Sequence, residues 1–287
     1  PKIVTRAILA SIMMAVFGVW LAVISMKARP IGVIDSGLGG LSILNTLTPI
    51  LKNEKFIYLA DHQYCPYGDR TSKQINQRLV AITNFLLEKN CKLVVVACNT
   101  ITTTSINFLR SIYPAIFFVG TVPAIKPAIE KNLKENIIVL ATQKTVSSEY
   151  FQEMIFNLDK KGKVHGIASP GLVESIESGN LKIIKQQINK IIKNIKANYS
   201  AIVLGCTHYI LVKDIIKKLT PFNVVILEPS QAIAKQTCKV LKDNNLLSNP
   251  TLKKPTTFYL TTGNPQKATQ TAKKLLNDSI IFDKCSI

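Results

Sequence analysis

The chain has no pair of closely spaced cysteines and no cysteine–histidine cluster with metal-ligand spacing. Six cysteines are scattered over 287 residues, and the closest two are seven residues apart: Cys65, Cys91, Cys98, Cys206, Cys238 and Cys285. This distribution excludes a zinc finger and a small disulfide-stapled domain. Scattered thiols in a chain of this size are typical of a reducing compartment, so we expect a cytoplasmic protein.

Acidic residues are also scarce, with 17 Asp and Glu against 36 Lys and Arg, which gives a net charge of +19. Such a charge attracts nucleic acids, anionic lipids and anionic substrates. The lysines over 181–193 alternate with isoleucines and form no basic block, so we expect them on solvated helix faces. The sequence motifs of the common nucleic-acid-binding folds are missing, and no nucleic-acid partner is expected.

Cofactor-binding motifs are missing as well. A glycine-rich turn, Asp35-Ser-Gly-Leu-Gly-Gly40, follows a short apolar run, but it is neither a G-x-G-x-x-G fingerprint nor a P-loop. Backbone N–H groups in such a turn can bind phosphate or carboxylate. Asp35 ends the apolar run, where a carboxylate either caps the next helix or faces a cleft. We expect no cofactor and no metal.

The hydrophobic stretch from Ala7 to Met26 contains no charged residue. Its length of about 20 residues spans roughly 30 Å, the hydrocarbon core of a bilayer. It predicts a transmembrane helix or an uncleaved anchor in the inner membrane. The alternative is an extension without a part in the chemistry, because 26–34 resembles an ordinary cytosolic amino terminus entering its first strand. Residues 1–29 are therefore set apart as a hydrophobic extension or anchor, and membrane contact through 7–26 stays open.

From Pro30 onward, short apolar runs alternate with amphipathic stretches, which predicts an α/β fold with parallel sheets and right-handed crossovers. We expect two pseudo-symmetric, doubly wound domains with the active site in the cleft between them. One domain would hold 30–121 plus 230–287 and the other 122–229, with the crossing at Pro123 and Pro127. Helices are expected near 41–51, 72–90, 101–113, 147–157, 181–196, 209–218 and 231–242.

Two of the predicted strands end alike. Leu93-Val-Val-Val-Ala-Cys98-Asn-Thr100 is echoed 108 residues later by Ala201-Ile-Val-Leu-Gly-Cys206-Thr-His208. Polar residues that follow a buried parallel strand lie at the sheet's carboxyl edge, where open α/β sheets bind ligands. A single such cysteine is more often a small buried hydrophobe, and Cys206 with His208 also suits a Cys–His hydrolase. Two facing thiols suit two-base proton transfer, in which one removes a proton from carbon and the other protonates the opposite face.

Several motifs together resemble the glutamate racemases of the cofactor-independent aspartate/glutamate racemase superfamily. They run in order from about Pro30 to the end of the chain: Ile31-Gly-Val-Ile-Asp-Ser-Gly-Leu-Gly-Gly-Leu-Ser, Cys65-Pro-Tyr-Gly-Asp, Val95-Val-Ala-Cys-Asn-Thr, Val119-Gly-Thr-Val-Pro-Ala-Ile-Lys-Pro-Ala and Leu204-Gly-Cys-Thr-His-Tyr. The resemblance implies interconversion of L- and D-glutamate, which supplies D-glutamate for peptidoglycan and the cell wall.

The resemblance also implies roles for individual residues. Cys98 is expected to act on D-glutamate with help from Asp35, and Cys206 on L-glutamate with help from His208. Glu177 is expected near the second thiol, with Glu174 as the less favoured candidate. The residues expected to bind substrate are Asp35, Ser36, Pro66, Tyr67, Gly68, Cys98, Asn99, Thr100, Cys206, Thr207 and His208.

Three departures from the family pattern, Ser169, Glu174 and Ile210, leave the expected catalytic positions in place but put the substrate loops in question. The stretch 122–127 resembles the subgroup activated by a muramyl-peptide precursor. A homodimer or a monomer is expected. Two alternatives stay open: a sister racemase acting on aspartate or a hydantoin, and a membrane-anchored basic binding module on a racemase-like scaffold.

Overall fold

The computed structural model describes residues 26–131, 133–250, 255–276 and 280–287. The hydrophobic stretch predicted at 7–26 therefore lies outside the described residues, apart from Met26. Within the described part, no helix has both the length and the apolar character needed to cross a bilayer.

Six parallel strands form the first sheet: β1 (Ile31–Asp35), β2 (Phe56–Ala60), β3 (Leu93–Val96), β4 (Phe117–Gly120), β9 (Thr257–Thr261) and β10 (Asp283–Lys284). Their order across the sheet is β10-β9-β2-β1-β3-β4. β1 is central and pairs in parallel with both β2 and β3, as Val33 does with Tyr58 and Val95. All residues of these three strands are buried, which explains their continuous apolar sequences.

Four parallel strands form the second sheet: β5 (Asn136–Ala141), β6 (Val164–Ala168), β7 (Tyr199–Leu204) and β8 (Val225–Leu227). Their order, β6-β5-β7-β8, repeats the order β2-β1-β3-β4 of the first sheet. The predicted α/β fold with two parallel sheets is therefore confirmed. β3 and β7 occupy equivalent places, so Cys98 and Cys206 follow equivalent strands.

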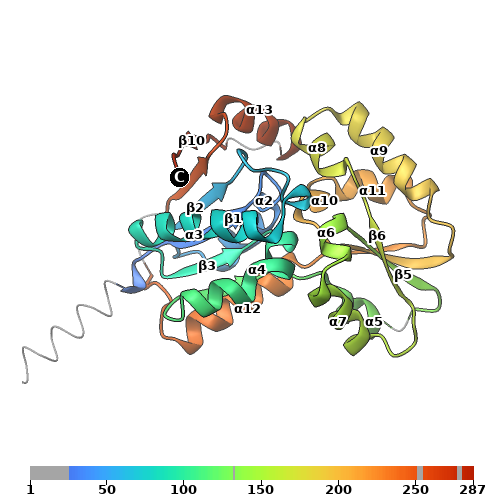
Figure 1. Cartoon of the computed structure of the whole chain (residues 1–287), viewed down its shortest axis with the longest axis horizontal. Coiled ribbons are helices and arrows are strands. Elements are labelled where there is room, and N and C mark those ends of the chain that lie inside the picture. Colours follow the sequence, from blue (N-terminus) through green and yellow to red (C-terminus); the bar gives the residue numbers. More distant parts are fainter. Residues whose placement is uncertain (1–25, 132, 251–254, 277–279) are drawn as a thin grey trace, which may run out of the picture.

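Helices connect the strands and cover both sheets (Figure 1). They are α2 (Leu41–Ile50), η1 (Tyr67–Asp69), α3 (Ser72–Glu88), α4 (Asn99–Ile112), α5 (Ile125–Glu130), α6 (Gln143–Val146), α7 (Glu149–Leu158), α8 (Leu172–Glu177), α9 (Leu181–Lys193), α10 (Thr207–Leu211), α11 (Lys213–Leu219), α12 (Ser230–Asp243) and α13 (Pro265–Leu276). The helix predicted near 209–218 is in fact two helices, α10 and α11, separated at Val212. The sequence pattern does not reveal this break because apolar residues continue through it.

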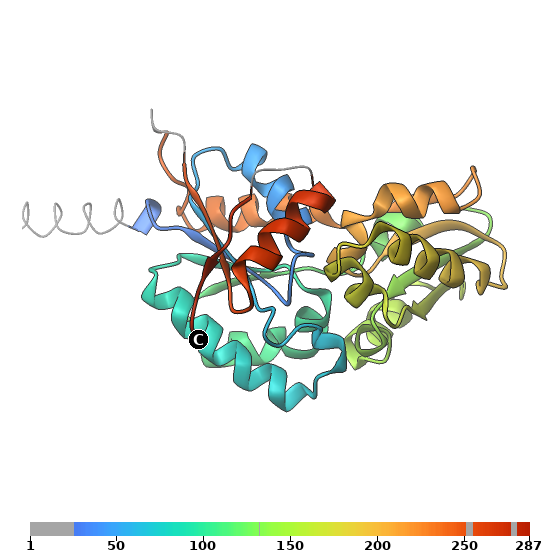
Figure 2. The same ribbon diagram turned by 90° about the horizontal axis from the view of Figure 1, so that it is seen from above.

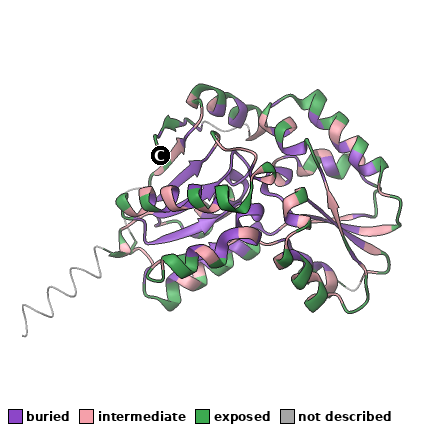
Figure 3. Ribbon diagram, viewed as in Figure 1, coloured by how far each residue is buried: buried purple, intermediate pink, exposed green. Residues whose placement is uncertain are grey.

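The chain passes from the first sheet to the second after β4 and returns through α12, which packs on α2. Figure 2 shows the elements of the second sheet gathered at one end of the molecule, away from β1 and β2. Apolar side chains pack on both faces of each sheet, and buried residues concentrate along the strands (Figure 3). This core fixes the carboxyl ends of β1, β3 and β7. The expected domain boundaries at 121/122 and 229/230 stay a prediction.

Candidate active site

The two cysteines that follow β3 and β7 occupy matching positions. Cys98 is the residue immediately before α4, and Cys206 is the residue immediately before α10; both have extended backbone and are 7% exposed. Burial, followed by the charge of Asp35, raises the pKa of the Cys98 thiol well above its ordinary value, and the proximity of Cys206 adds to the effect. These surroundings therefore disfavour the thiolate form of Cys98.

The molecule has two halves, one built on the first sheet and one on the second. Asp35, at the end of β1, lies between them. Its Oδ1 accepts a hydrogen bond from the Gly37 N–H at 2.8 Å, and its Oδ2 accepts one from the Thr207 hydroxyl at 3.0 Å. Burial raises the pKa of this carboxyl, although the charge of His208 and the two hydrogen bonds oppose the shift. A carboxylate with a raised pKa accepts a proton more readily than an exposed one, which suits a base beside a thiol.

A second acid–base group stands beside Cys206. His208 turns Nδ1 toward the Cys206 sulfur at 3.9 Å, and its Nε2 lies 2.6 Å from Oε1 of Glu177. Burial alone lowers the pKa of His208, but the contacts with Cys206 and Glu177 outweigh it and raise that pKa well above its ordinary value. Burial likewise opposes ionisation of Glu177, yet hydrogen bonds from His208 and His62 keep its pKa well below the ordinary range.

The structure places Glu177 in this cluster and leaves Glu174 outside it. Glu174 is exposed, whereas Glu177 is the last residue of α8 and reaches across to the first half of the molecule. There its Oε1 also accepts the Leu38 N–H at 2.7 Å. Of the two carboxylates expected near the second thiol, only Glu177 contacts His208 in the described structure.

The glycine-rich turn approaches the second half so closely that two of its positions leave no room for a Cβ. A Cβ at Gly37 would stand 2.0 Å from Glu177 Oε1, and a Cβ at Gly39 would stand 2.4 Å from His208 Nδ1. Any larger residue would push into the acid–base groups. The turn therefore serves contact between the halves, in addition to presenting backbone N–H groups.

His62 is a member of this cluster that sequence analysis missed. It lies in the loop after β2, with Nε2 at 3.2 Å from Glu177 Oε2 and Nδ1 at 2.7 Å from the Thr261 hydroxyl. The sequence motifs and the family resemblance assign His62 no role. The available signal was a histidine two residues beyond a buried strand, just before the predicted binding segment at 66–68.

Three further residues that were predicted to bind substrate, Asn99, Thr100 and Tyr67, differ in what they contact. Asn99 donates through Nδ2 to the Thr121 carbonyl at 3.3 Å, while its buried Oδ1 has no partner in the described structure. The Thr100 hydroxyl lies 3.0 Å from that of Thr142, on the second half. Tyr67 turns its hydroxyl away to Asp61 at 2.6 Å. Asp61 is itself held by Arg78, Tyr67 and Thr262, so it supports this loop.

Ser36, Pro66 and Gly68 lie at the same junction between the halves. Ser36 is buried, and its hydroxyl partly opposes the burial that raises the pKa of the Cys65 thiol. Pro66 lines a cavity of about 430 Å³ that also contacts His62, Cys65 and Glu177. A Cβ at Gly68 would meet Thr142 at 3.4 Å, an ordinary contact. The cavity thus adjoins the acid–base cluster, although its lining includes neither Cys98 nor Cys206.

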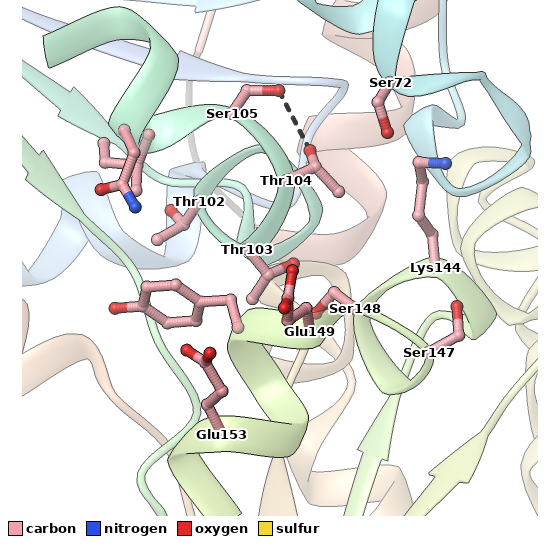
Figure 4. A pocket seen from close by; sticks show the side chains of 13 residues that line it. Ser72, Thr102, Thr103, Thr104, Ser105, Lys144, Ser147, Ser148, Glu149 and Glu153 are labelled. Atoms are coloured by element: carbon pink, nitrogen blue, oxygen red, sulfur yellow. Dashed lines mark hydrogen bonds between the residues drawn. The ribbon is translucent and has the colours of Figure 1, made fainter. Parts of the chain in front are cut away.

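A second cavity, of about 570 Å³, lies between α4 of the first half and α6 and α7 of the second (Figure 4). Its lining is rich in hydroxyl groups, among them Ser72, Thr103, Thr104, Ser147 and Ser148. Because both halves line it, a molecule bound there would contact both.

Among the described residues, Cys65, Glu177 and His208 place three ligand-type atoms within 4.8 Å of one another. These are donor types that zinc accepts. Glu177 and His208 already bond directly at 2.6 Å, and burial raises the pKa of Cys65 well above its ordinary value, so its thiol keeps its proton. The arrangement therefore fits a hydrogen-bonded acid–base network better than a metal centre.

Comparison with known proteins agrees with the resemblance seen in the sequence. The family model described as Asp/Glu/Hydantoin racemase matches residues 31–237. A glutamate racemase from Herpetosiphon aurantiacus is 41% identical over 243 residues, which cover 84% of this chain and 95% of that protein. The Francisella tularensis glutamate racemase, solved with D-glutamate, superposes with a TM-score of 0.78 at 29% identity, covering 91% of this chain and 98% of the other.

The Escherichia coli glutamate racemase, solved with L-glutamate and the activator UDP-MurNAc-Ala, gives a TM-score of 0.76 at 26% identity, with 89% and 97% of the two chains covered. The range matched by the family model includes Cys98, Cys206 and the acid–base groups beside them. The chain therefore belongs to the Asp/Glu/Hydantoin racemase family.

Proposed function

We propose that this protein interconverts L- and D-glutamate by two-thiol proton transfer without a cofactor. One observation carries the proposal: Cys98 and Cys206 follow equivalent strands of two equivalent sheets, and each has its own acid–base partner. Asp35 serves the first thiol and His208 the second, with Glu177 behind the histidine. The glutamate racemases named above support glutamate as the substrate.

In the L-to-D direction, Cys206 as thiolate takes the α-proton from L-glutamate and becomes a thiol. Cys98 gives its thiol proton to the opposite face of the same carbon and becomes a thiolate, so D-glutamate leaves with no net change in protons. The next L-to-D turnover requires Cys98 to regain a proton and Cys206 to lose one. The Asp35 carboxylate and the His208 imidazole, which lie beside these thiols, exchange those protons. The D-to-L direction reverses every step.

Loss of the α-proton places negative charge on carbon and on the α-carboxylate, which the site must stabilise. The first N–H groups of α4 lie beside Cys98, and those of Ile101 and Thr100 hydrogen-bond its sulfur. The unpartnered Asn99 Oδ1 is an acceptor suited to the substrate ammonium group. The site therefore offers donors that stabilise negative charge at Cys98 and an acceptor for the ammonium group.

The test is a chiral assay of each glutamate enantiomer without added cofactor, run in D₂O to follow α-hydrogen exchange. Cys98→Ala and Cys206→Ala should each abolish racemisation, because each removes one of the two proton carriers. Cys91→Ala is the matched control, since Cys91 is a buried cysteine that precedes β3, whereas Cys98 follows the opposite end of that strand. Full activity in either active-site variant would rule out the two-thiol mechanism. Racemisation of aspartate or a hydantoin in place of glutamate would assign the protein to a sister activity.

The E. coli structure, titled with its activator UDP-MurNAc-Ala, supports a further proposal that such a muramyl precursor activates this protein. The hydroxyl-rich cavity between α4 and α7 is the place we propose for it, because a ligand there would touch both halves. Added UDP-MurNAc-Ala should raise racemisation, and Thr103→Leu should reduce that stimulation. D-glutamate made under this control would supply peptidoglycan synthesis.

A further inference from the structure

His62 is an inner member of a hydrogen-bonded series of side chains that leads to Cys206. The series runs from the Thr261 hydroxyl through His62 and Glu177 to His208, with separations of 2.7, 3.2 and 2.6 Å, and ends 3.9 Å from the Cys206 sulfur. We propose that His62 is a positioning residue that holds Glu177 against His208 and so fixes the nitrogen presented to Cys206. The inference rests on the proposed racemase function.

The carboxylate of Glu177 sets the direction of the hydrogen bonds on both sides of it. An ionised carboxylate accepts and cannot donate, so Nε2 of His62 and Nε2 of His208 both carry a hydrogen toward Glu177. At the other end, the Gly263 N–H donates to the Thr261 oxygen at 3.0 Å, and the Thr261 hydroxyl hydrogen can go to Nδ1 of His62. A neutral His62 is therefore fully satisfied on both ring nitrogens, and His208 turns Nδ1 to the thiol.

The Glu177 carboxylate depends on His62 because its two oxygens have different hydrogen-bond partners. Oε1 receives both the Leu38 N–H and His208, whereas Oε2 receives only His62 among the described residues. Glu177 also lines the cavity of about 430 Å³. Without His62, the carboxylate can rotate toward that cavity and weaken its bond to His208. Glu177 also sits at the end of a helix of only six residues, which adds little rigidity of its own.

The His62 ring is itself fixed in place. Phe282 meets it edge-on, with ring centroids 6.3 Å apart and an interplanar angle of 72°. A Cβ at Gly263 would stand 2.6 Å from the His62 Cβ, so the backbone after β9 closes directly on this residue. An immobilised donor loses little entropy when it bonds Glu177, which is what positioning requires.

The consequence falls on the Cys206 side of the reaction. The groups that face His208 are Glu177 from α8, Asp35 from β1 and Cys206 after β7, and Glu177 in turn faces His62 and Cys65. Loss of the His62 donor would raise the pKa of Glu177, and rotation of its carboxylate away from His208 would lower the pKa of His208 toward its ordinary value. Proton removal from L-glutamate by Cys206 would slow, while removal from D-glutamate by Cys98 would not.

The experiment compares His62→Leu, which keeps the volume without a donor, with His62→Gln, which restores an N–H toward Glu177. His165→Ala is the matched control, because His165 is exposed and bonds Asn136 on the second sheet. His62→Leu should lower kcat about tenfold, the effect of losing a hydrogen bond to a charged group. The primary isotope effect should grow for α-deuterated L-glutamate and not for D-glutamate, and His62→Gln should recover most of the rate.

NMR titration of the imidazole signals gives a second measurement that needs no activity. His62→Leu should lower the pKa of His208, and Thr261→Val should act in the same direction should His62→Leu fail to fold. An unchanged His208 titration with unchanged isotope effects would overturn the inference. Absence of racemisation in the unaltered protein would refute the proposed function instead, and the titration would still decide whether His62 positions Glu177.

Discussion

The carboxylate of Asp35, from the first sheet, accepts a hydrogen bond from the hydroxyl of Thr207, from the second half, with 3.0 Å between Oδ2 and Oγ1. Both residues are buried, and each adjoins a different thiol: Asp35 acts on the pKa of Cys98, and Thr207 directly follows Cys206. This bond links the two halves of the site at its centre, so any change in how the halves meet alters the base beside Cys98.

Replacing Thr207 with valine keeps the side-chain shape and removes this donor. The donor lowers the pKa of Asp35, so its loss should raise that pKa further and move the acid limb of kcat for D-glutamate to higher pH. We also expect kcat/KM to fall about tenfold, as for other hydrogen bonds to charged groups. Thr207→Ser, which keeps the hydroxyl, is the control. An acid limb at the same pH in both variants would contradict the role given to Thr207.

Glu177 and His208 form a pair whose stabilising effect should depend on pH. The folded-state pKa of Glu177 is lowered, so its contribution is complete above about pH 4.3 and is lost as pH falls toward the folded value. The folded-state pKa of His208 is raised, so its contribution is complete below about pH 6.5 and is lost as pH rises through the folded value. Together they stabilise the fold most between these limits.

Urea unfolding of the unaltered protein and of Glu177→Gln should reveal this window. The difference in the free energy of unfolding should reach about 3 kcal/mol near pH 5.5, the scale for breaking a buried ion pair, and shrink by pH 9. The His208 side chain is 2% exposed and that of Glu177 is 16% exposed, so solvent screens the pair only weakly. A difference that does not change from pH 5.5 to pH 9 would show that His208 is not held as the cation.

Much of the architecture follows from local sequence patterns. The continuous apolar run before Cys98 and its echo before Cys206 predict buried parallel strands, because a strand covered on both faces has no polar alternation. Thiols after such strands lie at a carboxyl edge, which is why the sequence predicts that they face one pocket. The resemblance then assigns the partners Asp35 and His208.

Other parts of the site depend on contacts that no local pattern encodes. His62 and Thr261 are 199 residues apart, and only the pairing of β2 with β9 brings them within 2.7 Å. Likewise, the choice of Glu177 over Glu174 depends on which face of a six-residue helix meets Leu38. Such choices are set by tertiary packing, which sequence periodicity does not report.

Gly37 tests the close contact between the glycine-rich turn and the acid–base groups. In Gly37→Ala the new Cβ would fall 2.0 Å from Glu177 Oε1 and 3.1 Å from His208 Nε2, so the turn or the carboxylate must move. Either movement separates Glu177 from Leu38 or from His208. We expect kcat/KM to fall by about a hundredfold, comparable to losing two hydrogen bonds to charge.

Gly162→Ala is the control for this change. Gly162 has a φ of +66° in an exposed turn, and its added Cβ would meet nothing within 4 Å. Alanine there should cost about 1 kcal/mol through backbone strain and leave kcat/KM unchanged. Thermal unfolding and steady-state assays of both variants separate the two effects, because Gly37→Ala acts on the site and Gly162→Ala only on stability. Equal kcat/KM in Gly37→Ala and the unaltered protein would mean that the turn does not set the position of Glu177.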